Sequence, residues 1–527
     1  MNKFIEYLKN YTENKSVCIL GFGREGKSTY RLLKKYCFPR KTAICDLNPV
    51  ADIETETEVI TGENYQKCLD NFDIVFKSPG IVLEKSPTEL KCEITSETQV
   101  FFTVFREQII GITGTKGKCT VTSLIFHVLN ESGIDVRIAG NIGIPVFDIA
   151  EEIESDTVVV CELSCHQLEY MTVSPEKAVF LNLYEEHLDH YGTMENYYNA
   201  KKNIYLHQKE YDCLLINHDI APKNLHEPYI YTISAENKSA DCFVKDGTIF
   251  GKFGENYKIP TEKVKLLGIH NHYNIAVAYF VTSFYVSPED FTKALCTFSP
   301  LAHRLEYVDT IDGVRYYDDS ISTACATAIE AVKSVPDTQT ILIGGMDRGI
   351  DYSELADFLS KTDVNVICME KSGKRIFDMI QGMDFKNPER VYYVPHLDDA
   401  VALAHEITSV GKSCVLSPAS ASYGIFRNFE ERGDVFKKFV SELKENKRND
   451  LIKNIDKLHT TELGIERIKN NLSIKTDNVV EYCRKMIMNQ NAVIKRNGKN
   501  WYVIIQGYCI TVNAHSYTII TAHKIMS

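Results

Sequence analysis

Residues 111–120, GITGTKGKCT, constrain the fold more than any other part of this chain. They lie between residues 104–112, which are rich in β-branched and aromatic side chains, and residues 121–129, whose apolar side chains have helical spacing. The sequence therefore predicts a strand, a glycine-rich turn and a helix in succession. In that setting, backbone N–H groups, the helix N-terminus and Lys118 can bind the phosphates of a nucleoside triphosphate.

The residue after Lys118 is unusual for such a loop. A hydroxyl that binds Mg²⁺ is usual at this position, but Cys119 carries a thiol, which is a poor ligand for a hard cation. Either Thr120 supplies the hydroxyl or the metal depends on other ligands.

The length of 527 residues predicts three or four domains. No apolar run is long enough to cross a bilayer and the N-terminal sequence lacks the apolar core of a signal peptide, so we expect a cytoplasmic protein. Most of the sixteen cysteines lie in apolar stretches, which suits buried, reduced thiols. Cys161 and Cys165 have no second pair of ligands at metal-binding spacing, so a zinc site at this pair is not expected.

The charge is unevenly distributed along the chain. The net charge is −12, yet from residue 447 to the end thirteen Lys and Arg stand against six Asp and Glu. A basic C-terminal segment can attract RNA or another anionic partner, although a solvated charged surface is the simpler interpretation. We do not expect nucleic-acid binding elsewhere in the chain.

The first hundred residues have a βαβ pattern with a G-x-G-x-x-G turn at Gly21, Gly23 and Gly26. Asp46 ends the next predicted strand, where a ribose-binding acid would lie. Alone, this pattern indicates a dinucleotide. Because a separate phosphate loop follows downstream, we favour a nucleotide-linked sugar as the ligand.

Acids and histidines follow two predicted strands of the central region. Glu162 follows VVVC, and Glu186, His187, Asp189 and His190 follow AVFLNL. The carboxyl ends of parallel strands meet at one edge of a sheet, where ligands bind. Carboxylates with a neutral imidazole suit Mg²⁺ or Mn²⁺ shared with ATP phosphates.

Over residues 15–444, these and further segments resemble, in order, the motifs of the Mur ligase family of cell-wall synthesis. The segments are GTKGKCT, AGNIGIP, CELSCHQLE, NLYEEHLDHYGTMENYYNAK, GIHNHYN, LAHRLEYV, YDDSIST, GGMDRGID and LSPASASYGIFRNFEERGDVF. The resemblance is strongest to the branch that adds D-glutamate to UDP-N-acetylmuramoyl-L-alanine. It implies an α/β protein with a Rossmann-like domain (1–100), a P-loop ATPase-like domain (101–299) and a second Rossmann-like domain (300–445).

The resemblance also implies an activity. ATP would activate the terminal carboxylate of the UDP-linked substrate as an acyl phosphate, which the amine of glutamate would displace. We expect ATP, UDP-N-acetylmuramoyl-L-alanine and glutamate as small-molecule substrates, Mg²⁺ or Mn²⁺ as the metal, and a monomer. The sequence does not distinguish D- from L-glutamate.

Site residues are implied position by position. The catalytic residues would be Lys118, Glu162, His187 and Lys201. The metal ligands would be Glu162, His187, Thr120 and Lys201, the last as a carbamate. ATP would bind Gly114, Thr115, Lys116, Gly117, Lys118, Cys119, Thr120, Asn271, Asn274, Arg304 and Asp319. The UDP-linked substrate would bind Arg24, Glu25, Asp46, Ser78, Gly80 and Asn141. The amino acid would bind Thr323, Arg348, Ser422 and Phe429, although core packing is the simpler interpretation of Phe429.

Five residues depart from the family pattern, namely Cys119, Tyr184, Glu186, Ile321 and Arg348. They leave open an alternative function. The chain would then be a catalytically divergent nucleotide-binding protein whose basic tail binds RNA or another partner.

The resemblance ends near residue 446, and residues 446–527 predict a small α+β domain. Two helical segments precede the strands VIKRNG, KNWYVIIQGYCITVN and SYTIITAHK, similar to a family of short domains of uncharacterised function. We expect Trp501 to anchor its core. His515, Tyr517, Thr521, His523 and Lys524 are compatible with a nuclease-like or RNA-binding site, but ordinary outward-facing polar residues are the simpler interpretation.

Overall fold

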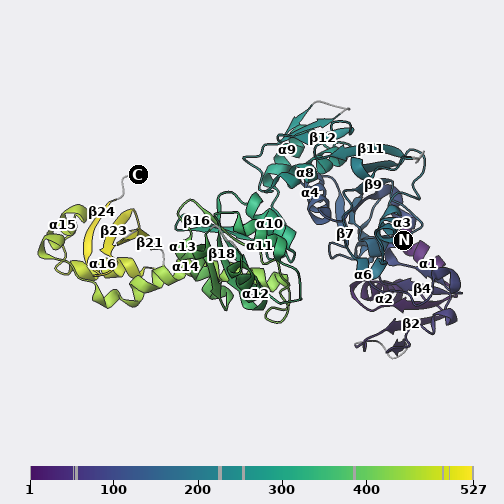
Figure 1. The fold of residues 1–527 in the computed structure, drawn as a ribbon, viewed down its shortest axis with the longest axis horizontal. Coiled ribbons are helices and arrows are strands. Elements are labelled where there is room, and N and C mark those ends of the chain that lie inside the picture. Colours follow the sequence, from purple (N-terminus) through teal and green to yellow (C-terminus); the bar gives the residue numbers. More distant parts are fainter. Residues whose placement is uncertain are drawn as a thin grey trace. The chain divides into compact units, whose positions relative to one another are not determined.

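The computed structural model describes residues 2–51, 53, 57–223, 228–251, 256–383, 387–489, 492–497 and 499–524. The chain divides into two compact units, Met1–Leu301 and Ala302–Ser527 (Figure 1).

The first unit begins with a five-stranded parallel sheet in the order β3-β2-β1-β4-β5. Its strands are β1 (Ser16–Leu20), β2 (Lys41–Asp46), β3 (Glu58–Thr61), β4 (Ile74–Lys77) and β5 (Glu93–Thr95). The remaining elements are α1 (Lys3–Thr12), α2 (Arg24–Tyr36), η1 (Leu69–Asn71) and η2 (Pro87–Glu89). A Cβ on Gly26 would lie 2.1 Å from the Gly21 carbonyl oxygen, so the predicted glycine turn between β1 and α2 needs glycine there.

A nine-stranded sheet follows, in the order β14-β13-β12-β11-β10-β9-β6-β8-β7. Its strands are β6 (Ile109–Thr113), β7 (Val136–Gly140), β8 (Val158–Glu162), β9 (Lys177–Phe180), β10 (Cys213–Asn217), β11 (Tyr229–Ser234), β12 (Cys242–Lys245), β13 (Thr248–Gly251) and β14 (Tyr257–Lys258). All pairs are parallel except β12 with β13 and β13 with β14. The carboxyl ends of β6, β8 and β9 therefore lie side by side, as the sequence predicted.

The helices of this part connect and cover the nine-stranded sheet. They are α3 (Glu97–Phe105), α4 (Lys118–Glu131), α5 (Cys165–Leu168), α6 (Leu188–Tyr191), α7 (Met194–Lys202), α8 (Ile269–Thr282) and α9 (Pro288–Thr297), with η3 (Arg106–Gln108), η4 (Val146–Glu152) and η5 (His218–Ile220). The predicted strand over 104–112 was partly wrong, because α3 extends to Phe105 and β6 begins only at Ile109. Of the aromatic side chains in the predicted strand, Phe105 packs in the core from the end of a helix.

The second unit contains a six-stranded sheet in the order β15-β16-β20-β17-β18-β19, parallel except for β15 with β16. Its strands are β15 (Glu306–Ile311), β16 (Val314–Asp318), β17 (Thr338–Ile343), β18 (Asn365–Met369), β19 (Val391–Val394) and β20 (Ser413–Leu416). Its helices are α10 (Cys325–Ser334), α11 (Ser353–Ser360), α12 (Glu370–Gln381), η6 (Pro388–Arg390), α13 (Leu397–Ile407) and α14 (Phe429–Lys453).

The C-terminal extension forms a four-stranded antiparallel sheet with helices packed on it (Figure 1). Its elements are η7 (Ile455–Lys457), α15 (Glu462–Leu472), α16 (Val479–Met488), β21 (Val493–Asn497), β22 (Asn500–Ile505), β23 (Tyr508–Asn513) and β24 (Ile519–Lys524). The single strand predicted over KNWYVIIQGYCITVN was wrong. Gln506 and Gly507, both at positive φ, form a two-residue turn that divides it into a hairpin.

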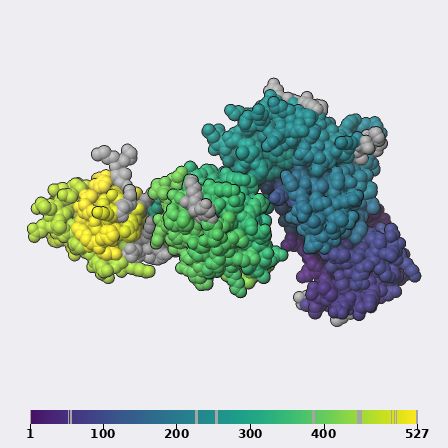
Figure 2. Space-filling model, in the orientation of Figure 1, coloured from purple at the N-terminus to yellow at the C-terminus, as the bar shows by residue number. Residues whose placement is uncertain are grey.

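Trp501 is fully buried in this extension, which confirms its predicted role as a core anchor. The extension is coloured lime and yellow in the space-filling view (Figure 2). The α/β fold class with a small α+β extension is thus confirmed.

Two further features bear on the protein's environment. Among the residues described, no helix has the length and apolar character needed to cross a bilayer. All sixteen cysteines, each within the described part of the chain, are free thiols.

Candidate active site

The turn between β6 and α4 has the conformation of a phosphate-binding loop. Gly114 and Gly117 have φ angles of 153° and 85°. A Cβ at Gly114 would lie 2.9 Å from Leu181 Cβ, and one at Gly117 would lie 2.8 Å from Asn274 Oδ1. Only glycine fits at both positions, so the loop can bring its backbone N–H groups close to a ligand.

Lys118 begins α4 and folds over this loop. Its Nζ donates hydrogen bonds to the carbonyl oxygens of Gly114, at 3.0 Å, and Thr115, at 2.9 Å. The ammonium group therefore lies at the mouth of the loop, where it can bind a phosphate as a point charge.

Asn182 is a loop contact that the sequence analysis missed. Its Oδ1 accepts hydrogen bonds from the backbone N–H groups of Thr115 and Lys116, at 3.1 and 2.8 Å. It follows β9 in the same segment as His187, and its position after a strand end was the available signal.

Glu162, the last residue of β8, lies beside the loop and is fully buried. Its Oε1 accepts a hydrogen bond of 2.8 Å from Asn141 Nδ2. Within the described structure, its Oε2 has no hydrogen-bond partner. A buried carboxylate oxygen in that state fits a role as a metal ligand, because leaving it unpaired is costly.

Lys201 on α7 approaches the loop from another side and is 1% exposed. Its Nζ donates a hydrogen bond of 2.9 Å to the Gly114 carbonyl oxygen. Burial, and then the positive charge of Lys118, lower the pKa of Lys201 to about 7. A large share of this amine is therefore neutral near pH 7.

The other predicted metal ligands differ in exposure. Thr120 is buried on α4, whereas the side chain of His187 is 42% exposed. His187 has a φ of 56° and is the N-cap residue that immediately precedes α6. Its ring lies 6.1 Å from that of Tyr197, and Lys201 Nζ lies 4.9 Å from the same ring.

Two asparagines of α8 border the loop. Asn274 Nδ2 donates a 2.8 Å hydrogen bond to Asn271 Oδ1, and Asn271 Nδ2 donates to the Leu267 carbonyl oxygen at 2.6 Å. Both residues are buried, and Asn274 is the side chain that excludes a Cβ at Gly117. The structure thus brings these predicted residues to the phosphate loop.

The geometry agrees with the comparisons with known proteins. Residues 112–282 match the Mur ligase middle domain family. The chain is 34% identical to UDP-N-acetylmuramoylalanine–D-glutamate ligase of Clostridium acetobutylicum over 466 residues, which cover 84% of this chain and 99% of that protein. The chain belongs to the Mur ligase family. The ligase of the same name from Ruminiclostridium cellulolyticum is 30% identical over 84% of this chain and 100% of its own length.

Solved structures show the same fold as this Mur ligase. The UDP-N-acetylmuramate-alanine ligase MurC of Thermotoga maritima is 16% identical with a TM-score of 0.51, over 81% of this chain and 99% of that one. The MurF ligase of the same organism, solved in complex with ADP, is 15% identical with a TM-score of 0.51, over 84% and 100%. Residues 452–523 match a protein family of unknown function, DUF3781, which confirms the resemblance predicted for the extension.

Around the five-stranded sheet of this Mur ligase, predicted substrate residues brace the glycine turn. Asp46 Oδ2 accepts a 2.7 Å hydrogen bond from the Phe22 N–H, and Ser78 Oγ donates one of 2.7 Å to the Gly21 carbonyl oxygen. Apart from Gly80 and its two chain neighbours, no heavy atom of the described residues lies within 4 Å of a Cβ built on Gly80, so the space beside that residue is open.

Arg24 and Glu25 instead contact segments that follow β7 and β8 of the nine-stranded sheet. Arg24 Nη1 donates to the Gly143 carbonyl oxygen at 3.2 Å, and Glu25 Oε1 accepts from Gln167 Nε2 at 2.8 Å. Burial raises the pKa of Glu25 to about 7. The contact of these two residues with substrate stays a prediction.

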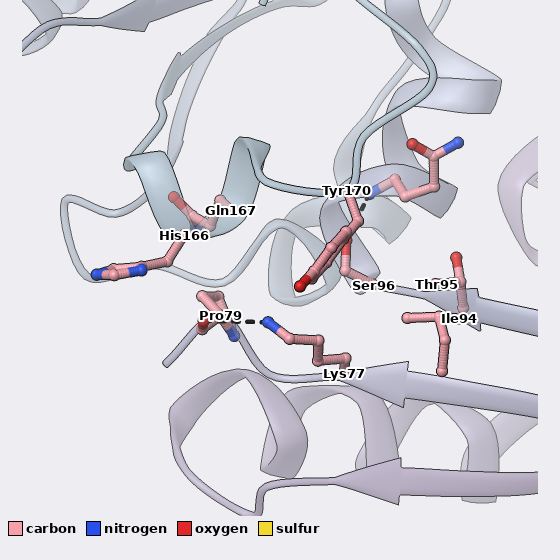
Figure 3. Close-up of a pocket in the computed structure, with 9 residues that line it drawn as sticks. Lys77, Pro79, Ile94, Thr95, Ser96, His166, Gln167 and Tyr170 are labelled. Atoms are coloured by element: carbon pink, nitrogen blue, oxygen red, sulfur yellow. Dashed lines mark hydrogen bonds between the residues drawn. The ribbon is translucent and has the colours of Figure 1, made fainter. Parts of the chain in front are cut away.

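A small cavity lies beside these residues, between β4, β5 and α5 (Figure 3). Lys77 extends into it beneath Tyr170, and its Nζ donates to the Pro79 carbonyl oxygen at 3.2 Å. Burial lowers the pKa of Lys77, although Glu169 lies 3.8 Å away. Sequence reasoning named the adjacent Ser78 but missed Lys77, because nothing in the pattern showed that this lysine is buried.

Histidines gather near the cavity. The ring of His166 lies 4.4 Å from that of His190 and 5.1 Å from that of His187. Burial, followed by the charges of these two neighbours, lowers the pKa of His166 to about 4. This imidazole is therefore neutral at physiological pH.

In the second unit, Asp319 follows β16 and is buried. Its Oδ2 accepts a 2.7 Å hydrogen bond from Ser417 Oγ, and burial raises its pKa to about 6. Arg304 lowers that pKa in part, and the Arg304 Nε is buried without a hydrogen-bond partner in the described structure. The two residues are therefore close, as the sequence predicted.

The predicted amino-acid residues differ among themselves. Ser422 is buried, Thr323 and Arg348 are exposed, and Phe429 is partly buried at the start of α14. The ring of Phe429 lies 6.2 Å from His303. The structure describes no contact that joins these four side chains, so their common pocket stays a prediction.

Arg432 is a positioning residue that the sequence analysis did not find. It is fully buried on α14, and burial lowers its pKa to about 10. Its guanidinium donates to the carbonyl oxygens of Ser320, at 2.8 Å, and Ser420, at 3.0 Å. It thereby holds together the loops that carry Asp319 and Ser422.

Proposed function

We propose that this Mur ligase uses ATP to join D-glutamate to UDP-N-acetylmuramoyl-L-alanine through an acyl phosphate, in peptidoglycan precursor synthesis. The observation that carries the proposal is the corner at the ends of β6 and β8. There the phosphate loop, the unpaired Oε2 of Glu162 and the buried amine of Lys201 meet. Relatives that bear the glutamate ligase name support the choice of substrates.

The residues of this corner have separable tasks. The loop N–H groups and Lys118 would bind the triphosphate and align its terminal group with the substrate carboxylate. Glu162, His187, Thr120 and a carbamate on Lys201 would hold Mg²⁺ or Mn²⁺. The ion would neutralise charge on the transferring phosphoryl group. The donors are oxygens and one imidazole, which fit that ion.

Carbamylation of Lys201 is part of the proposal. The neutral amine would add to the carbon of CO₂ and lose one proton, giving R–NH–COO⁻ and H⁺. The lowered pKa of Lys201 favours the neutral amine that this step requires. The product changes a cation into an anion, so a group that would repel the metal becomes a ligand for it.

Residues of the second unit would bind the other partners. Arg304 and Asp319 would contact ATP, and Thr323, Arg348, Ser422 and Phe429 would form the amino-acid pocket. The guanidinium of Arg348 can hold a carboxylate of glutamate with two parallel hydrogen bonds. We also propose that the enzyme acts as a monomer in the cytoplasm, where free thiols stay reduced.

ADP formation by the full chain tests this function. We expect ADP only when UDP-N-acetylmuramoyl-L-alanine and an amino acid are both present, with D-glutamate the best of a panel that includes L-glutamate. Tight ATP binding without substrate-dependent turnover would instead support a nucleotide-binding protein that has lost catalysis. The ligase relatives do not favour that alternative.

A further inference from the structure

Cys165, His166 and His187 form a second group of metal-binding side chains in the central domain. One ligand atom from each residue lies within 4.8 Å of those of the other two. Cys165 and His166 begin α5, three and four residues after Glu162, and His187 immediately precedes α6. Two short connections, one after β8 and one after β9, the two strands that flank β6, therefore bring one sulfur and two imidazoles together.

The donors of this group differ from those of the phosphate-loop corner. A thiolate with two imidazoles suits a borderline or soft divalent ion such as Zn²⁺, whereas Mg²⁺ prefers oxygen ligands. Three protein ligands leave one tetrahedral position for water, as in open zinc sites. Cys165 would release its thiol proton to solvent when the metal binds.

The surroundings also suit an ion that exchanges with solvent. Cys165 is buried at the base of the group, and His187 is exposed at its mouth. The Nδ1 of His166 lies 3.2 Å from the Tyr191 hydroxyl, which can orient the imidazole while Nε2 binds the metal. The ring of His166 stacks on that of Tyr191, with centroids 5.6 Å apart.

We propose that Cys165, His166 and His187 bind Zn²⁺, and that bound Zn²⁺ inhibits the ligase by withholding His187 from the catalytic metal. The binding statement stands on the three side chains alone. The inhibition rests on the proposed function, since it needs His187 as a ligand of the Mg²⁺ that accompanies ATP.

Cobalt tests the site directly, because Co²⁺ replaces Zn²⁺ at such sites and a cobalt–thiolate bond absorbs in the near ultraviolet. Titration of the full-length protein with Co²⁺ should produce this band with one ion per chain, and added Zn²⁺ should remove it. Cys165→Ser should abolish the band, and His166→Phe should weaken Zn²⁺ binding by about 100-fold. Cys296→Ser, which removes a partly exposed thiol of α9, should leave the titration unchanged.

A missing thiolate band, or a band that persists in Cys165→Ser, would overturn the site. Circular dichroism of Cys165→Ser and His166→Phe should match that of the parent protein. If either variant does not fold, X-ray absorption of the parent protein loaded with one Zn²⁺ should instead show one sulfur and two imidazole nitrogens bound to the ion, and a coordination shell without sulfur would overturn the site.

Inhibition is measured separately, as the ratio of rates with and without Zn²⁺ for each protein at saturating Mg²⁺ and ATP. Micromolar Zn²⁺ should slow the parent enzyme at least about tenfold and His166→Phe much less. Equal sensitivity of both would overturn the inhibitory role. If the protein binds cobalt but does not join glutamate to the UDP-linked substrate, the proposed function is contradicted and the metal site is not. If the protein catalyses that reaction but does not bind cobalt, the metal site is contradicted and the proposed function is not.

Discussion

The phosphate-loop corner and the predicted amino-acid residues are built in different ways. At the corner, Glu162 and Lys201 are buried, and the loop glycines leave no room for a Cβ. In the second unit, Thr323 and Arg348 are exposed at loop positions. In the proposed mechanism the packing of the fold would therefore fix the phosphoryl-transfer site, whereas the choice of amino acid would depend in part on exposed side chains that can change at little cost to the fold.

Lys118→Ala should have the largest effect on the first region. Without its ammonium group the terminal phosphate loses a charge partner, so we expect kcat to fall by about 10³-fold or more. Lys116→Ala is the matched control, because that exposed side chain lies over Tyr184, and it should cost less than about tenfold. Unchanged turnover in Lys118→Ala would refute the role given to the loop.

Lys201→Ala should reduce kcat by about 10²-fold, and small carboxylates should restore part of the loss by replacing the carbamate oxygens. Lys202→Ala, one residue further along α7, should need no rescue. Failure of formate, acetate and propionate at every concentration tested would argue against carbamylation.

The parent enzyme should depend on bicarbonate and on pH in a linked way. Since the pKa of Lys201 is about 7, its amine is neutral above that pH and charged below it. At a fixed partial pressure of CO₂, so that dissolved CO₂ is the same at each pH, carbamate content measured by ¹³C NMR should rise between about pH 6 and pH 8. A content that falls over this range would contradict the burial argument.

Part of the fold and of the candidate site was predictable from the sequence. The glycine spacing at Gly114 and Gly117 fixed the loop, and the acid after VVVC placed Glu162 at a strand end, because both are local patterns. The burial of Lys77 and Arg432 was not predictable, since it depends on segments far apart in the chain. Val104 and Phe105, the last two residues of α3, were misread as strand because such residues suit either structure until their neighbours are known.

Arg348→Ala tests the second region, the predicted amino-acid pocket. Loss of a charge-assisted pair should raise the KM for glutamate by about 10- to 100-fold while the KM for ATP changes little. Arg348→Lys, which restores the residue of the family pattern, should recover part of the loss. A larger change in the KM for ATP than in the KM for glutamate would contradict the assignment of Arg348 to the amino-acid pocket.

Cys119→Ser should have the smallest effect. A hydroxyl is a better Mg²⁺ ligand than a thiol, so we expect the Mg²⁺ concentration for half-maximal rate to fall by about two- to fivefold. Cys296→Ser again serves as the control. If the Mg²⁺ concentration for half-maximal rate stays the same in Cys119→Ser as in the parent enzyme, Thr120 or another ligand already binds Mg²⁺ well enough.

A crystal structure of the full chain with a non-hydrolysable ATP analogue and Mg²⁺ tests the central claim most directly. We expect the phosphates against the N–H groups of residues 114–120, and the ion bound to Glu162 and to a carbamate on Lys201. A nucleotide bound elsewhere would contradict this account. So would an ion bound at the site while Lys201 carries no carbamate.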